Sequence, residues 1–289
     1  FILIISFLNF KIPRFIQIIM NKKSLKKNIV RKNHISNNSS LSKRYDEIFK
    51  KGEQKHFTSF LTSGDPSSEA LEVLKQVKWK NKKIVDIGCG TGNFAFLASK
   101  KGANVLGIDY SEIAIKQAKK KFVQKNLEFK KMNVFELKEK FDVIVSIGTL
   151  EHTDNPLKTL KFLKRHLTKN GKLIITSPNW VNPRGYILMT LFHLFDARIT
   201  LLDLHHFTPV DFIKWSEILN MKLKWKTFDH SWAHGQKLVD DFKKRIPKIL
   251  SDMGIDNKNK QVKNFLDWIK TNILSFDNSS YHSGAIGLY

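Results

Sequence analysis

The chain has 289 residues, 42% of them hydrophobic, which is enough for one large domain or two small ones with a proper core. The only cysteine, Cys89, excludes a disulfide framework and favours a reducing compartment, so we expect a cytoplasmic protein. The net charge of +24 admits nucleic acid or an acidic membrane as a partner, although arginine, the better reader of nucleic acid, is scarce.

The N-terminal part is unlike the rest. Residues 1–44 carry ten Lys/Arg and no Asp/Glu. Residues 1–20 are apolar but interrupted by Lys11, Pro13 and Arg14, so they fall short of the roughly 20 apolar residues of a membrane span. We interpret residues 1–19 as an upstream extension of the gene model, with an interfacial anchor as the alternative. Residues 21–44 are expected to be a disordered basic arm, and folded structure is expected over residues 45–289.

Strands and helices then alternate along the chain. Apolar runs predict strands over 83–87, 103–108, 126–131, 141–147, 172–176, 221–229 and 284–289. Helical periodicity and start signals predict helices from Ser67 towards Val77, from Asn93, and over 111–121, 155–167, 186–195, 209–219, 237–250 and 261–273, with a turn at Asn170-Gly171. This order predicts an α/β fold, a Rossmann-like doubly wound sheet of seven strands, mostly parallel.

The strongest functional signal is the glycine loop after the first strand. Asp86 precedes three glycines with the spacing Gly88-x-Gly90-x-Gly92, and the second strand ends on Asp109. Glycines allow a sharp turn and close approach to a ligand, and a carboxylate at the next strand end suits the hydroxyls of a ribose. The third glycine comes one residue earlier than in the dinucleotide fingerprint, so a nucleoside other than a dinucleotide is favoured.

This segment resembles motif I of the class I S-adenosylmethionine (SAM) methyltransferases, D-x-G-x-G-x-G. The resemblance implies SAM as cofactor and an antiparallel last strand, which matches 284–289. Asn133 stands where the family usually has an acidic residue for the adenine amino group, and an amide oxygen can still accept that hydrogen bond. The cofactor-binding residues that the resemblance implies are Asp86, Gly88, Cys89, Gly90, Gly92, Asp109, Tyr110, Asn133, Val134 and Gly148.

A second resemblance follows the fourth strand. Gly148-Thr-Leu-Glu151-His152 is similar to the E-x-x-E-H segment of the quinone-biosynthesis O-methyltransferases, in which two glutamates and the histidine have been linked to a divalent metal. Gly148 replaces the first glutamate, and two protein ligands make a poor site, so we expect no metal. His152 is the leading candidate for a general base, and Glu151 orients it or replaces it.

Further candidates lie in and after a predicted substrate lid at about 178–208. The segment His205-His206-Phe-Thr-Pro209 resembles the H-x-F-T-P segment of the same group, and His206 is our third catalytic candidate. Weaker candidates for the substrate pocket are Trp180, Asn182, Arg184, Trp232 and His234.

These observations favour a SAM-dependent methyltransferase that methylates an oxygen of a partly apolar small molecule. The apolar lid motivates the apolar acceptor, and the second resemblance motivates O-transfer. Two alternatives remain open: an RNA or protein methyltransferase that docks through its basic arm, and a SAM-binding module without catalysis. Peripheral membrane contact, the oligomeric state and the identity of the acceptor also remain open.

Overall fold

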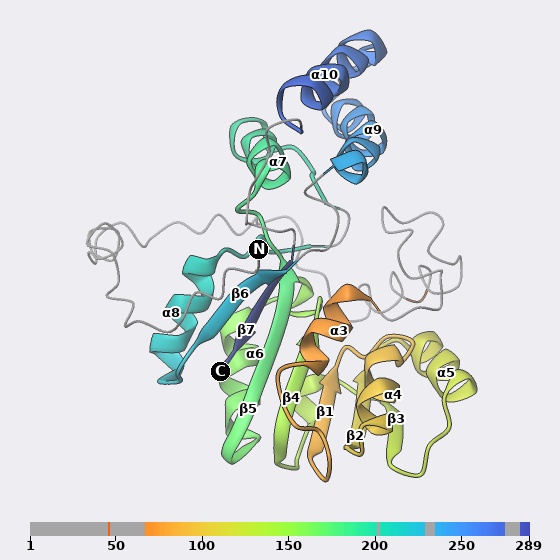
Figure 1. The fold of residues 1–289 in the computed structure, drawn as a ribbon, viewed down its shortest axis with the longest axis vertical. Coiled ribbons are helices and arrows are strands. Elements are labelled where there is room, and N and C mark those ends of the chain that lie inside the picture. The colour runs from red at the N-terminus through yellow and green to blue at the C-terminus, as the bar shows by residue number, and fades with distance from the viewer. Residues whose placement is uncertain (1–45, 47–66, 201–202, 229–234, 275–283) are drawn as a thin grey trace. The chain divides into compact units, whose positions relative to one another are not determined.

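The computed structural model describes residue 46 and residues 67–200, 203–228, 235–274 and 284–289. These residues form a seven-stranded sheet of order β3-β2-β1-β4-β5-β7-β6, in which every pairing is parallel except the two made by β7 (Figure 1). The predicted doubly wound sheet with an antiparallel last strand is therefore confirmed. The strands are β1 (Lys83–Ile87), β2 (Asn104–Asp109), β3 (Leu127–Lys131), β4 (Phe141–Ile147), β5 (Leu167–Pro178), β6 (Lys224–Phe228) and β7 (Gly284–Leu288).

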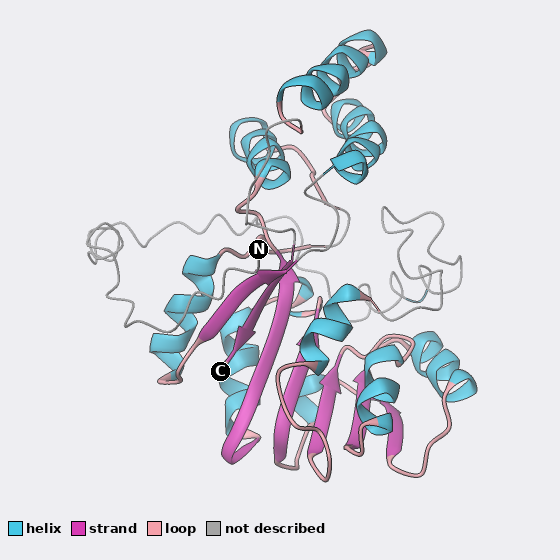
Figure 2. Cartoon of the chain, viewed as in Figure 1, coloured by secondary structure: helices cyan, strands magenta, loops and turns pink. Residues whose placement is uncertain are grey.

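Helices cover both faces of this sheet (Figure 2). One core joins α3, α4 and α5 to one face, and a second joins α6 and α8 to the other. The central strands are apolar on both faces, because Ile84 of β1 packs into the first core and Val85 into the second. The bounds are α3 (Ser68–Leu74), α4 (Asn93–Lys100), α5 (Glu112–Lys121), α6 (Pro156–Arg165) and α8 (Pro209–Leu219), with short 3-10 helices η2 (Val134–Glu136) and η3 (Leu150–His152).

Side-chain caps explain where several helices begin. The side chains of Ser67, Ser111 and Asn155 accept hydrogen bonds from the first turns of α3, α5 and α6. Thr208 and Asp211 form a capping box at the start of α8. Each satisfies an amide that has no partner within its helix, which typically stabilises a protein by about 1 kcal/mol.

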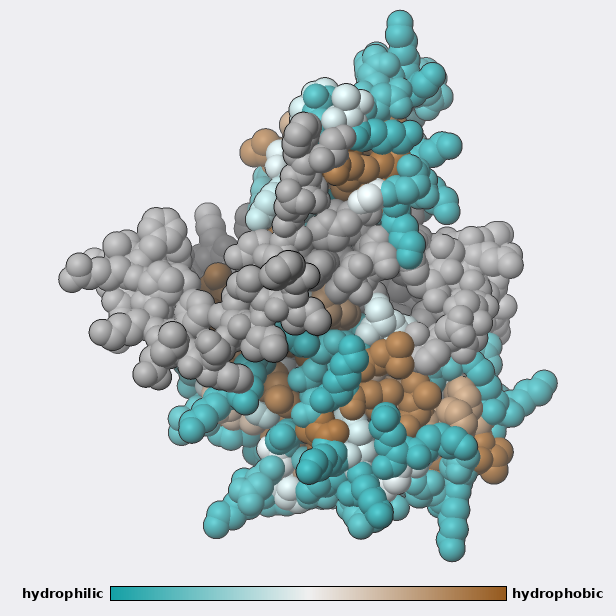
Figure 3. Space-filling view, in the orientation of Figure 1, coloured by the Kyte–Doolittle hydropathy of each residue, from teal (hydrophilic) through white to brown (hydrophobic). Residues whose placement is uncertain are grey.

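A third hydrophobic core shares no residues with the two cores on the sheet. It is built from α7 (Pro183–Phe195), α9 (Gly235–Asp252) and α10 (Asn259–Asn272), together with Trp180, Ala197 and Ile199. Figure 3 shows one face of the molecule, on which hydrophilic side chains predominate and hydrophobic ones form separate patches. Of the helices that the structure describes, none combines the length and the apolar character that a membrane crossing needs.

One prediction at the fifth strand is wrong: the helix expected to reach residue 167 ends at Arg165, and β5 already begins at Leu167. The predicted Asn170-Gly171 turn falls inside β5, where the pairing with β4 jumps from Phe141↔Leu167 to Val143↔Lys172. A Cβ atom on Gly171 would lie 3.0 Å from Leu167 Cβ, so the chain does bend back there. The extra residues of β5 form an irregularity within the strand. The predicted basic arm and the candidates Trp232 and His234 lie outside the described residues.

Candidate active site

The glycine loop turns sharply at the carboxyl end of β1. Gly88, Gly90 and Gly92 all have positive φ, at 68°, 51° and 83°. A Cβ atom on Gly88 would lie 2.5 Å from the Thr149 side chain, and one on Gly92 would lie 2.5 Å from Phe129 Cζ. The loop thus depends on glycine both for its backbone conformation and for its close packing.

Asp109 holds this loop against the end of β2. Its Oδ2 accepts a hydrogen bond from the Gly90 amide at 3.0 Å, and its Oδ1 accepts one from the Ser111 amide at 2.8 Å. Burial raises the pKa of Asp109, and these two amides act in the opposite direction. Each carboxylate oxygen has a further lone pair, so the residue can clamp the loop and still accept the hydroxyls of a ribose.

Asp86 is a buried carboxyl group at the same loop. It is 2% exposed, and among the residues that the structure describes its Oδ2 has no hydrogen-bond partner. Burial, and then the charge of Asp109, raise the pKa of Asp86 to about 8. A cationic group bound beside it would relieve this penalty. SAM carries both an ammonium and a sulfonium, so the residues present fit that cofactor.

The other predicted cofactor residues lie at the ends of neighbouring strands. Tyr110 follows β2 and is partly buried, Val134 begins η2 after β3, and Gly148 follows β4 with φ +54°. Asn133 caps η2, because its Oδ1 accepts a hydrogen bond from the Phe135 amide at 3.0 Å. The sheet order places β3, β2, β1 and β4 side by side, so these ends form one continuous edge.

Cys89 lies within the glycine loop and is not an activated nucleophile. Its amide donates to the Ile108 carbonyl at 2.9 Å, alongside that of Gly88 at 2.8 Å. Burial is the main cause that raises the pKa of the thiol, and the charges of Asp86 and Asp109 add to it. A reactive cysteine needs a lowered pKa, so Cys89 has a structural part in the loop.

Glu151 and His152 meet a third polar residue, Asp203. Each of the three offers a ligand-type atom, and these atoms lie within 4.8 Å of one another. His152 Nδ1 is 3.4 Å from Asp203 Oδ1. Glu151 is 3% exposed, and burial, followed by the charge of Asp203, raises its pKa well above the ordinary value. We call Glu151, His152 and Asp203 the carboxylate–histidine cluster.

Backbone contacts hold Asp203 in this cluster. The amides of Leu204 and His205 both donate to the Glu151 carbonyl, at 2.9 and 3.1 Å. The His205 ring Nε2 lies 2.8 Å from the Thr153 carbonyl oxygen. The last part of the predicted lid is therefore fixed to η3. The sequence did not predict Asp203, because it lies about fifty residues after His152 and no local motif connects the two.

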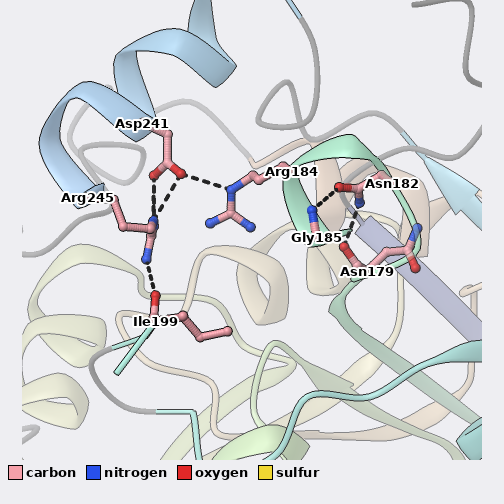
Figure 4. A network of polar contacts seen from close by, with 7 residues as sticks. All are labelled: Asn179, Asn182, Arg184, Gly185, Ile199, Asp241 and Arg245. Carbon is pink, nitrogen blue, oxygen red and sulfur yellow. Dashed lines mark hydrogen bonds and ion pairs between the residues drawn. The ribbon is translucent and has the colours of Figure 1, made fainter. Parts of the chain in front are cut away.

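His206 and the three lid candidates make contacts of a different kind. His206 packs edge-on against Trp180 and Phe192, with ring centroids 4.9 and 4.7 Å away. It is not part of the carboxylate–histidine cluster among the described residues. Asn182 caps α7 by accepting from the Gly185 amide, and it donates to the Asn179 carbonyl at 2.7 Å (Figure 4).

Arg184 takes part in a buried ion network between α7 and α9. Asp241 accepts from Arg184 Nε at 2.9 Å and from Arg245 Nη2 at 2.7 Å, and Arg245 Nη1 donates to the Ile199 carbonyl at 2.7 Å (Figure 4). All three charged side chains are less than one tenth exposed. The network fixes how the third core is assembled, and a pocket-forming role of Arg184 stays a prediction.

A family model described as a methyltransferase domain matches residues 78–235, more than half of the chain. The chain belongs to this methyltransferase family. The matched region begins just before β1 and contains the glycine loop and the carboxylate–histidine cluster. SAM is therefore the cofactor of this methyltransferase domain, and the buried carboxyls at the sheet edge agree with it.

Similar proteins share the domain and differ in their named substrates. A ubiquinone biosynthesis O-methyltransferase of Dechloromonas aromatica is 26% identical over 151 residues, which are 49% of this chain and 65% of that protein. A tRNA U34 carboxymethyltransferase of Campylobacter fetus is 34% identical over 102 residues, 33% of this chain and 36% of that protein. The chain thus spans less than two thirds of these relatives.

The fold also matches solved structures over most of its length. A SAM-dependent methyltransferase of Thermotoga maritima has a TM-score of 0.51 and 15% sequence identity, over 86% of this chain and 97% of that one. At this identity the similarity concerns the fold alone.

Proposed function

We propose that the protein is a SAM-dependent methyltransferase that methylates a hydroxyl oxygen of a partly apolar small molecule. The observation that carries the proposal is the carboxylate–histidine cluster, which follows β4 on the same sheet edge as the glycine loop. Its side chains can hold the acceptor hydroxyl and take up its proton beside the place where SAM would present its methyl group. The 26% identity to a ubiquinone biosynthesis O-methyltransferase supports O-directed transfer.

The reaction is an in-line displacement at the SAM methyl carbon. The acceptor oxygen forms the new C–O bond while the S–CH₃ bond breaks and S-adenosylhomocysteine leaves as a neutral thioether. The protein mainly aligns oxygen, carbon and sulfur, and alignment of this kind contributes about 7–11 kcal/mol in well-oriented reactions. Asp109 and the glycine loop would fix the cofactor end of that line.

The acceptor hydroxyl must also lose its proton. Of the two candidate bases we favour His152, because its side chain is 19% exposed and can be reached by an acceptor, whereas Glu151 is only 3% exposed. Asp203, 3.4 Å from His152 Nδ1, would orient the imidazole and stabilise its positive charge.

The cofactor half of the proposal is tested by calorimetry. Asp109→Ala should weaken SAM binding at least tenfold, because it removes the clamp on the Gly90 amide and the acceptor for the ribose. His152→Ala should leave SAM affinity unchanged and lower kcat, with a smaller loss of activity than Asp109→Ala. Equal SAM affinity in wild type and Asp109→Ala would refute the assigned cofactor site.

The acceptor half is tested with tritiated SAM in a cell extract that is then separated into RNA, protein, lipid and small solutes. Label in the lipid or small-solute fraction is expected. Label in no fraction would favour a SAM-binding module without catalysis.

RNA is the second candidate substrate, favoured by the net charge of +24 and by the 34% identity to a tRNA-modifying enzyme over 102 residues. Label in the RNA fraction would establish it. Deleting residues 1–44 should abolish that labelling if the basic arm docks the RNA, whereas a small-molecule enzyme keeps its turnover.

A further inference from the structure

The outer side of α6 combines positive charge with aromatic rings. Between Pro156 and His166 the sequence contains no Asp or Glu, and Leu160 and Leu163 are buried in the second core. The opposite side of the helix therefore faces outward. We use the name α6 face for the outward side chains of this helix and its C-cap, together with the neighbouring Phe135 of η2: Phe135, Lys158, Lys161, Phe162, Arg165 and His166.

The three rings of the α6 face form a continuous row. Phe135 meets Phe162 edge to face with 5.1 Å between the ring centroids, and the Phe162 centroid lies 4.2 Å from that of His166. Phe135 is 43% exposed, although an aromatic ring of this size is usually buried. It follows directly on Asn133 and Val134, which are predicted to bind the cofactor, so the row begins at the cofactor edge of the sheet.

Cations lie along this row of rings. Lys158 Nζ is 5.4 Å from the Phe135 centroid, and Arg165 Cζ is 5.6 Å from the Phe162 centroid. Within the part of the chain that the structure describes, Lys158, Lys161 and Arg165 form no ion pair. They are three or four residues apart, so they lie on one stripe of the helix. A stripe of uncompensated cations attracts a polyanion.

We propose that the α6 face binds a single strand of nucleic acid. Bases stack on Phe135 and on the Arg165 guanidinium, and phosphates lie against the lysines. The strand must be single, because stacking on protein rings needs bases that are not already paired and stacked. An anionic membrane fits this face less well, because the apolar side of α6 is packed on the sheet and cannot enter lipid.

The inference goes beyond the proposed function and does not depend on it. The carboxylate–histidine cluster precedes α6, whereas the α6 face runs along the outer side of the helix. A strand can therefore bind here whether the methyl acceptor is a small molecule or the strand itself. Binding needs no methyl transfer, so the two properties can be measured separately.

The experiment follows a fluorescein-labelled oligouridylate by fluorescence anisotropy as the full-length protein is added. Phe135→Ala should weaken binding roughly fivefold or more, because a stacking platform is lost. Phe195→Ala is the matched control, since it makes the same change on an exposed ring of α7, and it should bind like wild type. Circular dichroism of each variant checks folding.

The phosphate contacts are tested by charge. Lys158→Gln combined with Lys161→Gln should weaken binding and make the slope of log affinity against log salt shallower, by about 0.7 for each lysine that contacts a phosphate. Lys243→Gln combined with Lys244→Gln removes the same charge from exposed positions of α9 and should leave affinity and slope unchanged. The basic arm is present in every variant, so its contribution cancels in the comparison.

A second measurement needs no variant. An oligonucleotide that contains 4-thiouridine, irradiated in the complex with wild type, should crosslink to peptides that carry Phe135 or Phe162. Tighter binding of oligouridylate than of oligothymidylate would identify the strand as RNA, and the reverse order would identify it as DNA.

Three results would overturn the proposal: equal losses of affinity in the α6 and α9 lysine variants, wild-type affinity in Phe135→Ala, or crosslinks confined to residues 1–44. Phosphatidylglycerol vesicles that bind wild type but not the α6 lysine variant, with no binding of either oligonucleotide, would assign the face to a membrane instead. Methyl transfer to a small solute without strand binding leaves the proposed function standing and removes this inference, and strand binding without any methyl transfer does the reverse.

Discussion

Asp86 should make the stability of the cofactor-free protein fall as the pH rises. Its pKa is about 8 in the folded protein against an ordinary value of 3.8, because the carboxyl is buried and lies near Asp109. Between these values the folded state holds a proton that the unfolded state has released. Stability therefore declines with increasing pH throughout this window, by about 1.4 kcal/mol per pH unit from this group.

Asp86→Asn removes the titration and keeps the shape of the side chain. Between pH 5 and pH 7, wild type should lose about 3 kcal/mol of unfolding free energy relative to Asp86→Asn. The pKa of Asp109 is raised chiefly by its own burial, so its contribution stays in both proteins and cancels in the comparison. Urea unfolding at pH 5, 6 and 7, followed by circular dichroism, measures the difference. Parallel pH profiles for the two proteins would refute the reasoning, because they would mean that Asp86 is ionised in the fold.

Three further substitutions test the packing of the glycine loop and of the third core. Gly92→Ala should lower the free energy of unfolding by at least about 2 kcal/mol, because Gly92 has a positive φ and the added Cβ would overlap Phe129. Gly254→Ala is the control: it has a similar φ, but no described atom lies within 4 Å of the added Cβ. In the same urea assay it should lower the free energy of unfolding by only about 1 kcal/mol. Asp241→Asn should cost about 3–5 kcal/mol because it leaves the buried charges of Arg184 and Arg245 uncompensated; an unchanged urea midpoint would show that the network is open to water.

The sequence predicted most of the sheet because its central strands are unbroken apolar runs. The predicted bounds of β1 and β4 agree with the structure residue for residue. The start of β5 at Leu167 was missed, because the pair Phe141↔Leu167 precedes the Asn170-Gly171 turn and depends on a contact with another strand.

The site was predictable only where its residues are close in sequence. Glu151 and His152 stand together in one motif, whereas Asp203 reaches them through backbone hydrogen bonds between residues about fifty positions apart. The pairing of Arg184 with Asp241 has the same origin, since it depends on the packing of α7 against α9. Such contacts have no local sequence signal, so an argument from motifs and spacing misses them.

The division of the hydrophobic interior into three cores bears on how this protein can change during evolution. The residues that form the cofactor edge are supported by the two sheet cores, while α7, α9 and α10 are held by their own core and by the Asp241 ion network. A substitution within α7, α9 or α10 therefore alters that region without loosening the strands that carry the glycine loop. Selection for a new acceptor can act on those helices while the residues that bind SAM stay the same.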